Sequence, residues 1–300
     1  MIEVMALHKR FDKNAALDGL ELRVKKGSIY GLIGVNGSGK TTALKAITGI
    51  LRPDAGEALM DGQPVYENLE LKARVGFIPD ELFFFGAYSL DECAAFYRRL
   101  YPNWNSGRYA EMKERFGLPE RGRVTRFSKG MQKQAAFLLT MSVMPDYLIL
   151  DEPIDGLDPL VRKLVWKYIV DDVAARSMTV LVSSHNLREM EGICDSIGIL
   201  DKGKMFIERE LDELKSDIHK VQAAFPEGTP EEGRYDGLGV LHREKRGAVE
   251  LLIIRSPEET VRAVIGSRSP LIFDILPLSL EEIFIYELGG ERNALGDIIF

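Results

Sequence analysis

The sequence predicts an α/β fold followed by a smaller α+β unit, and two observations carry this prediction. Short apolar segments alternate with segments of helical periodicity along most of the chain, which is typical of a largely parallel sheet with crossover helices. The charge balance then changes, because residues 1–214 hold 29 basic and 31 acidic side chains, whereas residues 215–300 hold 10 and 15. We therefore expect one domain at 1–214 and a C-terminal accessory domain at 215–300.

Composition excludes several classes of protein. The 300 residues are 45% hydrophobic, which is ample for a buried core, and the net charge of −7 disfavours a general nucleic-acid binder. The two cysteines, Cys93 and Cys194, lack the spacing of a disulfide framework or a zinc site. Apolar runs such as Phe137–Met144 are far shorter than the roughly 18 residues that cross a bilayer, and Met1–Val4 does not resemble a signal segment. We expect a reduced, cytoplasmic protein.

The first elements lead to a glycine-rich turn. Apolar residues predict short strands at Ile2–Leu7 and Leu20–Val24, separated by an Asp-Gly pair. A buried strand is expected over Ser28–Val35, and Gly34–Lys40 forms a glycine-rich turn. Apolar residues three apart then predict a helix over Thr41–Ile50.

Helices are expected to dominate residues 89–145. Ser89 is suited to cap one of them, and Ser128 begins another that runs to Val143. Strands and helices alternate after that. They are the strand Tyr147–Leu150, the helix Val161–Ala175, the strand Thr179–Ser183, a helix capped by Asn186 and the strand Ser196–Leu200.

The last part of the chain has a different pattern. Residues 208–216 are charged and predict a helical segment, and residues 226–233 are rich in Pro, Gly and Glu and predict an exposed loop. Ser256 and Ser279 each precede a helix-forming segment and are expected to cap it. The strands expected here are Val221–Phe225, Gly239–His242 and Val249–Ile254.

The glycine-rich turn fits the pattern G-x-x-x-x-G-K-[ST] of a phosphate-binding loop. Its glycines let backbone N–H groups turn toward an anion, and the helix that follows directs its N-terminus at the same anion. Lys40 would bridge the β- and γ-phosphates of a nucleotide, and the Thr41 hydroxyl would ligate Mg²⁺. The expected nucleotide-binding residues are Gly34, Asn36, Gly37, Ser38, Gly39, Lys40, Thr41 and Thr42.

A second pattern narrows the choice among kinases, GTPases and motor ATPases, which the loop alone leaves open. The apolar strand Tyr147–Leu150 ends in the carboxylates Asp151 and Glu152, which are costly there unless a cation is present. Asp151 is expected to hold the Mg²⁺ shell. Glu152 is expected to polarise a water molecule that attacks the γ-phosphate. Two solvated loop acids are the alternative.

The full order of motifs resembles the ATP-binding subunits of ABC transporters. After the phosphate-binding loop come Phe127–Gln132, which resembles the signature motif of that family, then Asp151–Pro153, Asp155–Asp158 and Ser183–His185. The resemblance covers residues 2 to about 214. It implies a P-loop NTPase fold, the ABC ATPase domain, with a mixed core sheet, an antiparallel β subdomain and a helical subdomain at about 82–145.

The resemblance also implies roles for individual residues. The catalytic residues would be Lys40, Glu152 and His185, with His185 in contact with the γ-phosphate. The signature residues would contact ATP held by a second subunit. They are Ser128, Lys129, Gly130 and Met131, and the D-loop residues are Asp155, Gly156, Leu157 and Asp158.

Three positions carry residues whose roles the resemblance leaves open. Lys129 and Met131 replace the glycine and glutamine of the common signature, and Lys129 either adds charge toward phosphate or is simply solvated. Asp80 stands where the family usually has Gln, and its oxygens suit Mg²⁺. Phe11 lies where the family places an aromatic ring on adenine, with packing in the core as the alternative.

The resemblance implies partners as well. One phosphate-binding loop and one signature per chain imply a head-to-tail dimer, a homodimer or a heterodimer, that closes on two ATP molecules with Mg²⁺. A separate transmembrane permease is implied, so this subunit would lie peripherally on the inner face of the membrane, with no nucleic acid as partner. Residues 82–85, Leu-Phe-Phe-Phe, are the expected permease contact, or else they pack within the helical subdomain.

The whole chain is most similar to exporter-type (ABC-2) ATPases of Gram-positive bacteria, the Ytr type linked to acetoin utilisation. An alternative is a soluble ABC-type ATPase that acts on nucleic acid or the ribosome, but tandem cassettes, a coiled coil and zinc cysteines are absent from the sequence. A regulatory module without turnover conflicts with the presence of both Glu152 and His185. The C-terminal part would stabilise the dimer, regulate it or pack as an appendage.

Overall fold

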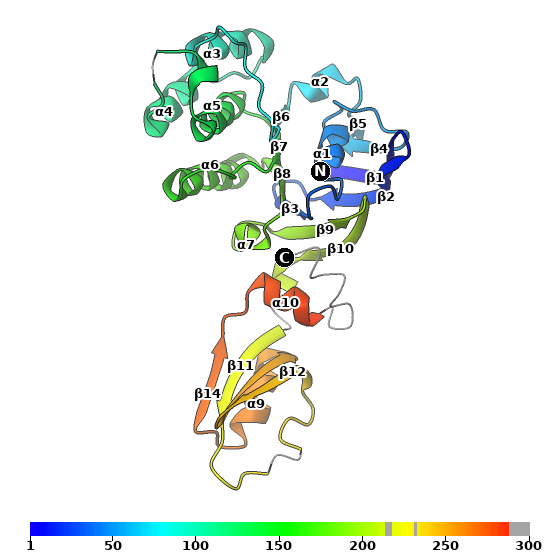
Figure 1. Ribbon diagram of the computed structural model, residues 1–300, viewed down its shortest axis with the longest axis vertical. Helices are drawn as coiled ribbons and strands as arrows, with labels where there is room; N and C mark the ends of the chain where they lie inside the picture. Colours follow the sequence, from blue (N-terminus) through cyan, green and yellow to red (C-terminus); the bar gives the residue numbers. More distant parts are fainter. Residues whose placement is uncertain (120, 214–217, 231–232, 288–300) are drawn as a thin grey trace. The chain divides into compact units, whose positions relative to one another are not determined.

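We describe the fold from a computed structural model of the chain, which describes residues 1–119, 121–213, 218–230 and 233–287. The chain divides into two compact units (Figure 1). The first comprises residues 1–185 and 192–208, and the second comprises residues 186–191 together with the chain from Arg209 onward. Each unit is described by itself below.

An antiparallel sheet in the order β2-β1-β4-β5 opens the first unit. Its strands are β1 (Ile2–Phe11), β2 (Asn14–Val24), β4 (Ala55–Met60) and β5 (Gln63–Pro64). The prediction of short strands broken at the Asp-Gly pair is wrong, because β1 and β2 form one long hairpin. Shifts in the register of β1 and β2 accommodate the turn-forming Asp-Gly pair within the hairpin, where Gly19 has a φ of 76°.

The core sheet has six strands in the order β10-β9-β3-β8-β7-β6. The pairs β9–β3, β3–β8, β8–β7 and β7–β6 are parallel, which confirms the predicted largely parallel core. Five strands of this sheet are buried along most of their length, as a parallel sheet covered on both faces requires. The strands are β3 (Ile29–Ile33), β6 (Val75–Ile78), β7 (Tyr147–Asp151), β8 (Thr179–Ser184), β9 (Ser196–Asp201) and β10 (Lys204–Glu210).

Helices cover the core sheet in the first unit (Figure 1). Helix α1 (Lys40–Ile47) contacts β7, β2 and β4, so it lies between the core sheet and the antiparallel sheet. Helix α5 (Lys129–Ser142) packs against β6 on the other side and contacts α3 and α4, and α6 (Pro159–Arg176) follows β7 in the chain. The remaining helices of this unit are α2 (Leu69–Lys72), α3 (Leu90–Leu100), α4 (Ser106–Phe116) and the 3-10 turn Val124–Arg126.

The predicted helix starts at Ser89 and Ser128 are confirmed. The Ser89 hydroxyl accepts from the Glu92 backbone N–H while the Glu92 carboxylate accepts from that of Ser89, which makes a full capping box for α3. The Ser128 side chain accepts from the Met131 N–H and caps α5. Both caps fix where the helices of the segment 89–145 begin.

The second unit holds a four-stranded antiparallel sheet in the order β12-β13-β11-β14. Helix α9 packs on it through a buried apolar cluster that includes Val221, Leu252, Val261 and Ile265. Helix α10 contacts the short helix α7. The elements are α7 (Leu187–Met190), β11 (Ile218–Ala224), β12 (Gly239–Arg246), β13 (Val249–Arg255), α9 (Glu258–Gly266), β14 (Ile272–Leu276) and α10 (Leu280–Glu287).

Two local predictions in this region are wrong, and one is confirmed. Residues 208–210 belong to β10 rather than to a helix, residues 211–213 are helical, and the rest of the predicted segment lies outside the described residues. Ser256 does not cap α9, because its hydroxyl donates to the Arg255 carbonyl and accepts from Gly239 N–H of the neighbouring strand. Ser279 does form the predicted capping box with Glu282.

Among the residues that the structure describes, no helix is both long enough and apolar enough to cross a bilayer.

Candidate active site

The predicted phosphate-binding loop lies between β3 and α1. Gly39 directly precedes α1 with a φ of 111°, and a Cβ there would lie 2.5 Å from the Ala16 carbonyl oxygen, so only glycine fits. No side chain caps the start of α1, which leaves its first N–H groups directed at the loop. The Lys40 ammonium donates to the Gly34 carbonyl at 2.5 Å and lies 3.3 Å from Glu152 Oε1. The ammonium group of Lys40 is therefore buried among oxygens, which come from the loop backbone and from the Glu152 carboxylate.

Asp151 is held at the end of β7 by hydroxyl groups from two other elements. The Thr41 hydroxyl donates to Asp151 Oδ2 at 2.7 Å, and the Ser183 hydroxyl donates to Asp151 Oδ1 at 2.6 Å. Asp151 pairs with Ser183 in the parallel register of β7 and β8, and this places the two side chains together. The carboxylate is fully buried, so the two hydroxyls satisfy oxygens that would otherwise be left without partners.

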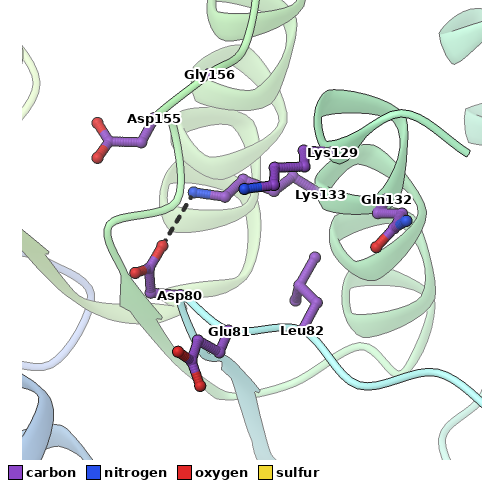
Figure 2. Close-up of a pocket in the computed structure, with 8 residues that line it drawn as sticks. All are labelled: Asp80, Glu81, Leu82, Lys129, Gln132, Lys133, Asp155 and Gly156. Carbon is purple, nitrogen blue, oxygen red and sulfur yellow. Dashed lines mark hydrogen bonds and ion pairs between the residues drawn. The ribbon is translucent and has the colours of Figure 1, made fainter. Parts of the chain in front are cut away.

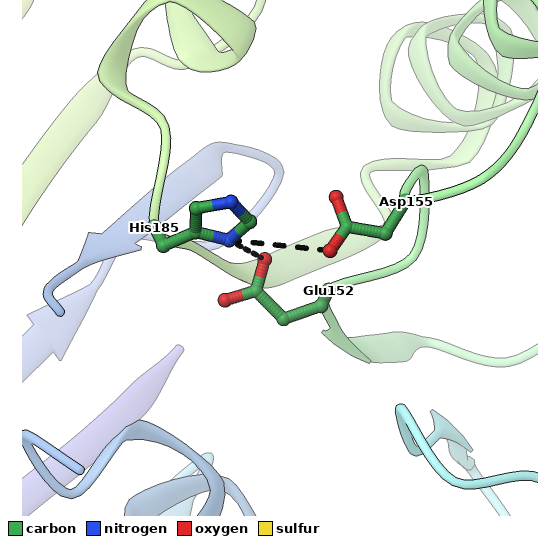
Figure 3. A group of neighbouring side chains, drawn as sticks. All are labelled: Glu152, Asp155 and His185. Carbon is green, nitrogen blue, oxygen red and sulfur yellow. Dashed lines mark hydrogen bonds and ion pairs between the residues drawn. The ribbon is translucent and has the colours of Figure 1, made fainter. Parts of the chain in front are cut away.

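Glu152 and His185 come together beside the loop (Figure 3). His185 Nδ1 lies 3.0 Å from Glu152 Oε2 and 4.0 Å from Asp155 Oδ2. The other Glu152 oxygen, Oε1, faces Lys40. The structure thus brings the three residues predicted to be catalytic, Lys40, Glu152 and His185, into one cluster, with the Glu152 carboxylate at its centre.

A pocket of about 480 Å³ lies over this cluster. Phe11 lines it and is 49% exposed, so its ring does not pack in the core and is open to a ligand. The Ser38 hydroxyl is buried without a hydrogen-bond partner among the described residues, which is what a group awaiting a phosphate oxygen would show. The predicted nucleotide-binding residues of the loop and of α1 that line the pocket are Asn36, Gly37, Gly39, Lys40, Thr41 and Thr42.

The three predicted magnesium ligands also line one pocket. Thr41, Asp80 and Asp151 face a space of about 570 Å³. Hydroxyl and carboxylate oxygens are hard ligands of the kind that Mg²⁺ prefers, so the donor set fits this ion. Glu152, Asp155 and His185 also have ligand atoms within 4.8 Å of one another, but a histidine nitrogen suits transition metals better than Mg²⁺.

The predicted signature residues lie elsewhere in the same unit. Lys129 lines a pocket of about 690 Å³ together with Asp80, Lys133, Asp155 and Gly156 (Figure 2). Gly130 approaches the D-loop so closely that a Cβ there would lie 3.2 Å from the Gly156 carbonyl oxygen. Within the described residues, the pocket over Lys40 is not lined by Ser128, Lys129, Gly130 or Met131.

Three residues of this region were missed from the sequence. Ser183 holds Asp151, Lys133 donates to the Glu152 carbonyl at 2.8 Å, and Lys202 lines the pocket over the loop. The register of the parallel strands β7 and β8 places Ser183 beside Asp151. The sequence of one strand by itself does not specify that register. Lys133 follows the signature on α5, but only the fold shows that it points back to β7.

The aromatic segment after Asp80 is largely exposed. Phe83 is 83% exposed, whereas the ring of Phe85 contacts Tyr88 and Phe96 at centroid distances of 5.0 and 5.3 Å. Phe85 therefore packs on helix α3, as the second interpretation of this segment expects, whereas Phe83 is exposed.

Comparison with known proteins gives a consistent picture. A family model described as ABC transporter matches residues 17–155. The ABC transporter ATP-binding protein YtrB of Bacillus subtilis (strain 168) is 33% identical over 293 residues, which cover 98% of this chain and 100% of YtrB. The Nod factor export ATP-binding protein I of Burkholderia lata is 28% identical and covers 97% of this chain and 98% of its own length.

A solved structure agrees with the fold. It is described as the structure of the ATP binding subunit of an ABC transporter, and it matches this chain with a TM-score of 0.66 at 26% identity. The match covers 72% of this chain and 92% of that one.

Proposed function

This chain belongs to the ABC transporter family of ATP-binding proteins, and on that premise we propose that it hydrolyses ATP to energise an exporter in the membrane. The observation that carries the proposal is the cluster of Lys40, Glu152 and His185 beside the phosphate-binding loop. Export rather than import is supported by relatives that match over nearly the full chain and are named for export. The substrate would be selected by the permease.

In this proposal the loop and its surroundings hold the nucleotide. Phe11 stacks on the adenine ring, and the N–H groups at the start of α1 together with Ser38 and Lys40 bind the phosphates. Thr41, Asp151 and Asp80 are the groups that would hold Mg²⁺, which neutralises phosphate charge when bound. Ser183 keeps Asp151 in place by donating to its second oxygen.

Glu152 acts as the general base in this proposal. It accepts a proton from the water that attacks the γ-phosphate, and its carboxylate is already aimed by Lys40 on one oxygen and His185 on the other. His185 orients Glu152 and contacts the γ-phosphate. Because the site holds both residues, the chain has the groups that turnover requires and is not limited to nucleotide binding.

We further propose that two such subunits close head to tail on two ATP molecules. Ser128, Lys129, Gly130 and Met131 are separated from the pocket over Lys40 in their own chain, which fits a contact made across to a partner. The start of α5 favours an anion there, because the aligned peptide dipoles of a helix place partial positive charge at its N-terminus. The partner is a second copy or a related ATPase.

The exposed aromatic Phe83 is the proposed point of contact with a separate permease. A permanent apolar surface of this kind is typical of an interaction site. The subunit would then lie peripherally on the inner face of the cell membrane. A soluble ABC-type ATPase that acts on nucleic acid or the ribosome is not favoured, because the relatives that match over the full chain are named as transporter or export proteins.

We propose that residues 1–214 form the ATPase domain and residues 215–300 an accessory domain. The solved relative covers 72% of the chain, which supports an ATPase domain that ends well before the C-terminus. The second sheet, with its own cluster around Val221 and Leu252, supports a separate accessory fold.

Hydrolysis is tested by replacing the loop lysine. Lys40→Ala removes the ammonium that would bind the β- and γ-phosphates, so we expect a loss of at least about a hundredfold in steady-state ATPase activity. Phosphate release from Mg-ATP is the measurement, and Lys26→Ala, an exposed lysine after β2, is the matched control. Unchanged hydrolysis in Lys40→Ala would remove the catalytic assignment.

Transport is tested by isolating the chain from membranes. We expect an integral membrane protein to co-purify with it in mild detergent and to raise its ATPase activity. Recovery with ribosomes or nucleic acid instead would support the soluble alternative.

A further inference from the structure

Glu152 has an unusual backbone conformation. Its φ is 47°, in the left-handed region that few residues other than glycine adopt. Side chains from two other elements hold it there. Its N–H donates to the Ser183 hydroxyl at 3.2 Å, and its carbonyl accepts from the Lys133 ammonium at 2.8 Å. Hydrogen bonds at both the N–H and the carbonyl of Glu152 thus fix the backbone conformation of the proposed general base.

Lys133 joins three separate segments through one ammonium group. It lies on α5, one turn after the signature residue Lys129, and its side chain is only 13% exposed. Besides the Glu152 carbonyl, the ammonium reaches Asp80 Oδ1 at 3.4 Å (Figure 2). Asp80 in turn lies between the pocket lined by Thr41 and the pocket lined by Lys129.

These contacts place Lys133 between the segment that would meet a partner subunit and the residue that would activate water. The ammonium does not line the pocket over Lys40 of its own chain, so it does not contact a nucleotide bound in that pocket. Within the chain, its effect on the reaction passes through its two contacts, the Glu152 carbonyl and the Asp80 carboxylate. A shift of about 1 Å in a reacting group is enough to slow a reaction about a hundredfold.

We propose that Lys133 is a positioning residue for hydrolysis. It holds Glu152 in the left-handed conformation that aims its carboxylate at Lys40 and His185, and it ties that conformation to Asp80 and to helix α5. Asp80 supplies the negative charge that keeps the ammonium in place. This inference rests on the proposed role of Glu152, and the experiment below includes a readout that does not depend on hydrolysis.

The test compares Lys133→Met, which keeps an unbranched chain as far as Cε but has no ammonium to donate, with Lys133→Arg, which can donate. For Lys133→Met we expect kcat to fall about tenfold or more and KM for Mg-ATP to change less than about threefold, because only the placement of the base is lost. Lys133→Arg recovers most of kcat. Lys163→Met, an exposed lysine on α6, is the control with unchanged kinetics.

Asp80→Asn probes the second partner. We expect it to lower kcat in the unmodified chain and to lower it by a smaller factor in Lys133→Met, because the part of its effect that passes through the contact with Lys133 is already lost there. Additive effects of the two substitutions would overturn the link between Asp80 and Lys133.

Amide hydrogen exchange over residues 147–158 provides the readout that does not depend on activity. We expect faster exchange in this segment for Lys133→Met and an unchanged rate for Lys133→Arg and Lys163→Met. Unchanged exchange in Lys133→Met, or a kcat within twofold of the unmodified chain, overturns the proposal. The proposed function would instead be overturned if the chain had no ATPase activity that Lys40→Ala abolishes. In that case the exchange result still decides whether Lys133 holds the Glu152 backbone.

Discussion

At the scale of single residues, the site is organised around two adjacent carboxylates with different surroundings. Asp151 is buried, and the hydroxyls of Thr41 and Ser183 fix its carboxylate at the proposed cation site. Glu152 instead contacts a lysine and a histidine, and the pocket opens above it. Neighbouring acids in such distinct environments are suited to different tasks, one electrostatic and one that moves a proton.

Glu152→Gln separates binding from hydrolysis. The amide keeps the size of the side chain but does not accept a proton from water, so we expect ATP to be bound and not cleaved, and the ATP-bound dimer to accumulate. Size-exclusion chromatography with Mg-ATP measures this, and Glu111→Gln, an exposed acid on α4, is the control. A variant that stays monomeric with Mg-ATP would contradict the proposed closure on ATP.

The sequence predicted several members of this site but not Ser183, Lys133 or Lys202, and not the contacts between side chains. The spacing of Gly34 to Thr41 and the acids after an apolar strand identified most of the cluster, because both patterns are local. The contact of Lys133 with Glu152 depends on how α5 packs against the core sheet, and that of Ser183 depends on strand register. Contacts set by tertiary packing leave no periodic signal in a single sequence.

At the scale of elements, the segment between β6 and α3 combines a packed face and an exposed one. The capping box at Ser89 fixes the start of α3, and Phe85 rests on Phe96 of that helix. The ring of Phe83 touches that of Phe85 edge-on, at a centroid distance of 6.0 Å, and otherwise remains exposed. The same local run of aromatic residues therefore serves both the fold and the surface, which composition alone left undecided.

Substituting one exposed and one buried phenylalanine tests whether surface and core aromatic residues have separate roles. Phe83→Ala removes a side chain that is 83% exposed, so we expect little change in stability or basal ATPase activity but weaker co-purification with the permease. Phe137→Ala, at a position on α5 that is 3% exposed, is expected to lower the free energy of unfolding by about 3–5 kcal/mol. Thermal unfolding and membrane pull-down are the measurements. Full retention on the permease in Phe83→Ala would place that contact elsewhere.

At the scale of the whole molecule, the two compact units have separate apolar cores. The first is built around strands such as β1 and β3, and the second around Val221, Leu252 and Val261. The alternation of strands and helices predicted the first unit well, whereas the bulged hairpin of β1 and β2 and the strand β10 were missed. The bulges of the β1–β2 hairpin accommodate its turn-forming residues, and the exposed edge strand β10 accommodates charged ones. The strand propensity of the individual residues was therefore misleading in both places.

Separate cores mean that each unit has its own determinants of stability, and Glu250 is the clearest one in the second unit. Its buried carboxylate accepts from Arg234 at 2.5 Å and from Arg243 and Tyr235 at 2.8 Å. Burial alone would raise the pKa of Glu250, but the hydrogen bonds from Arg243 and Tyr235 outweigh it and hold the pKa below its usual value. A carboxylate with a lowered pKa stabilises the fold above its unfolded pKa and loses that contribution as the pH falls.

We therefore expect the second unit to lose stability as the pH falls from about 4.5 through the lowered pKa of Glu250, because the carboxylate is then protonated. We expect Glu250→Gln to lower the stability of this unit already at neutral pH. Removing one partner from a buried pair leaves Arg234 uncompensated, which costs about 3–5 kcal/mol. Calorimetry between pH 7 and about pH 3.5, with Mg-ATP present to stabilise the first unit, separates the two transitions. Glu244→Gln removes an exposed partner of Arg246 and is expected to leave both transitions unchanged. An acid-sensitive transition that persists unaltered in Glu250→Gln would show that other groups govern the unfolding of this unit.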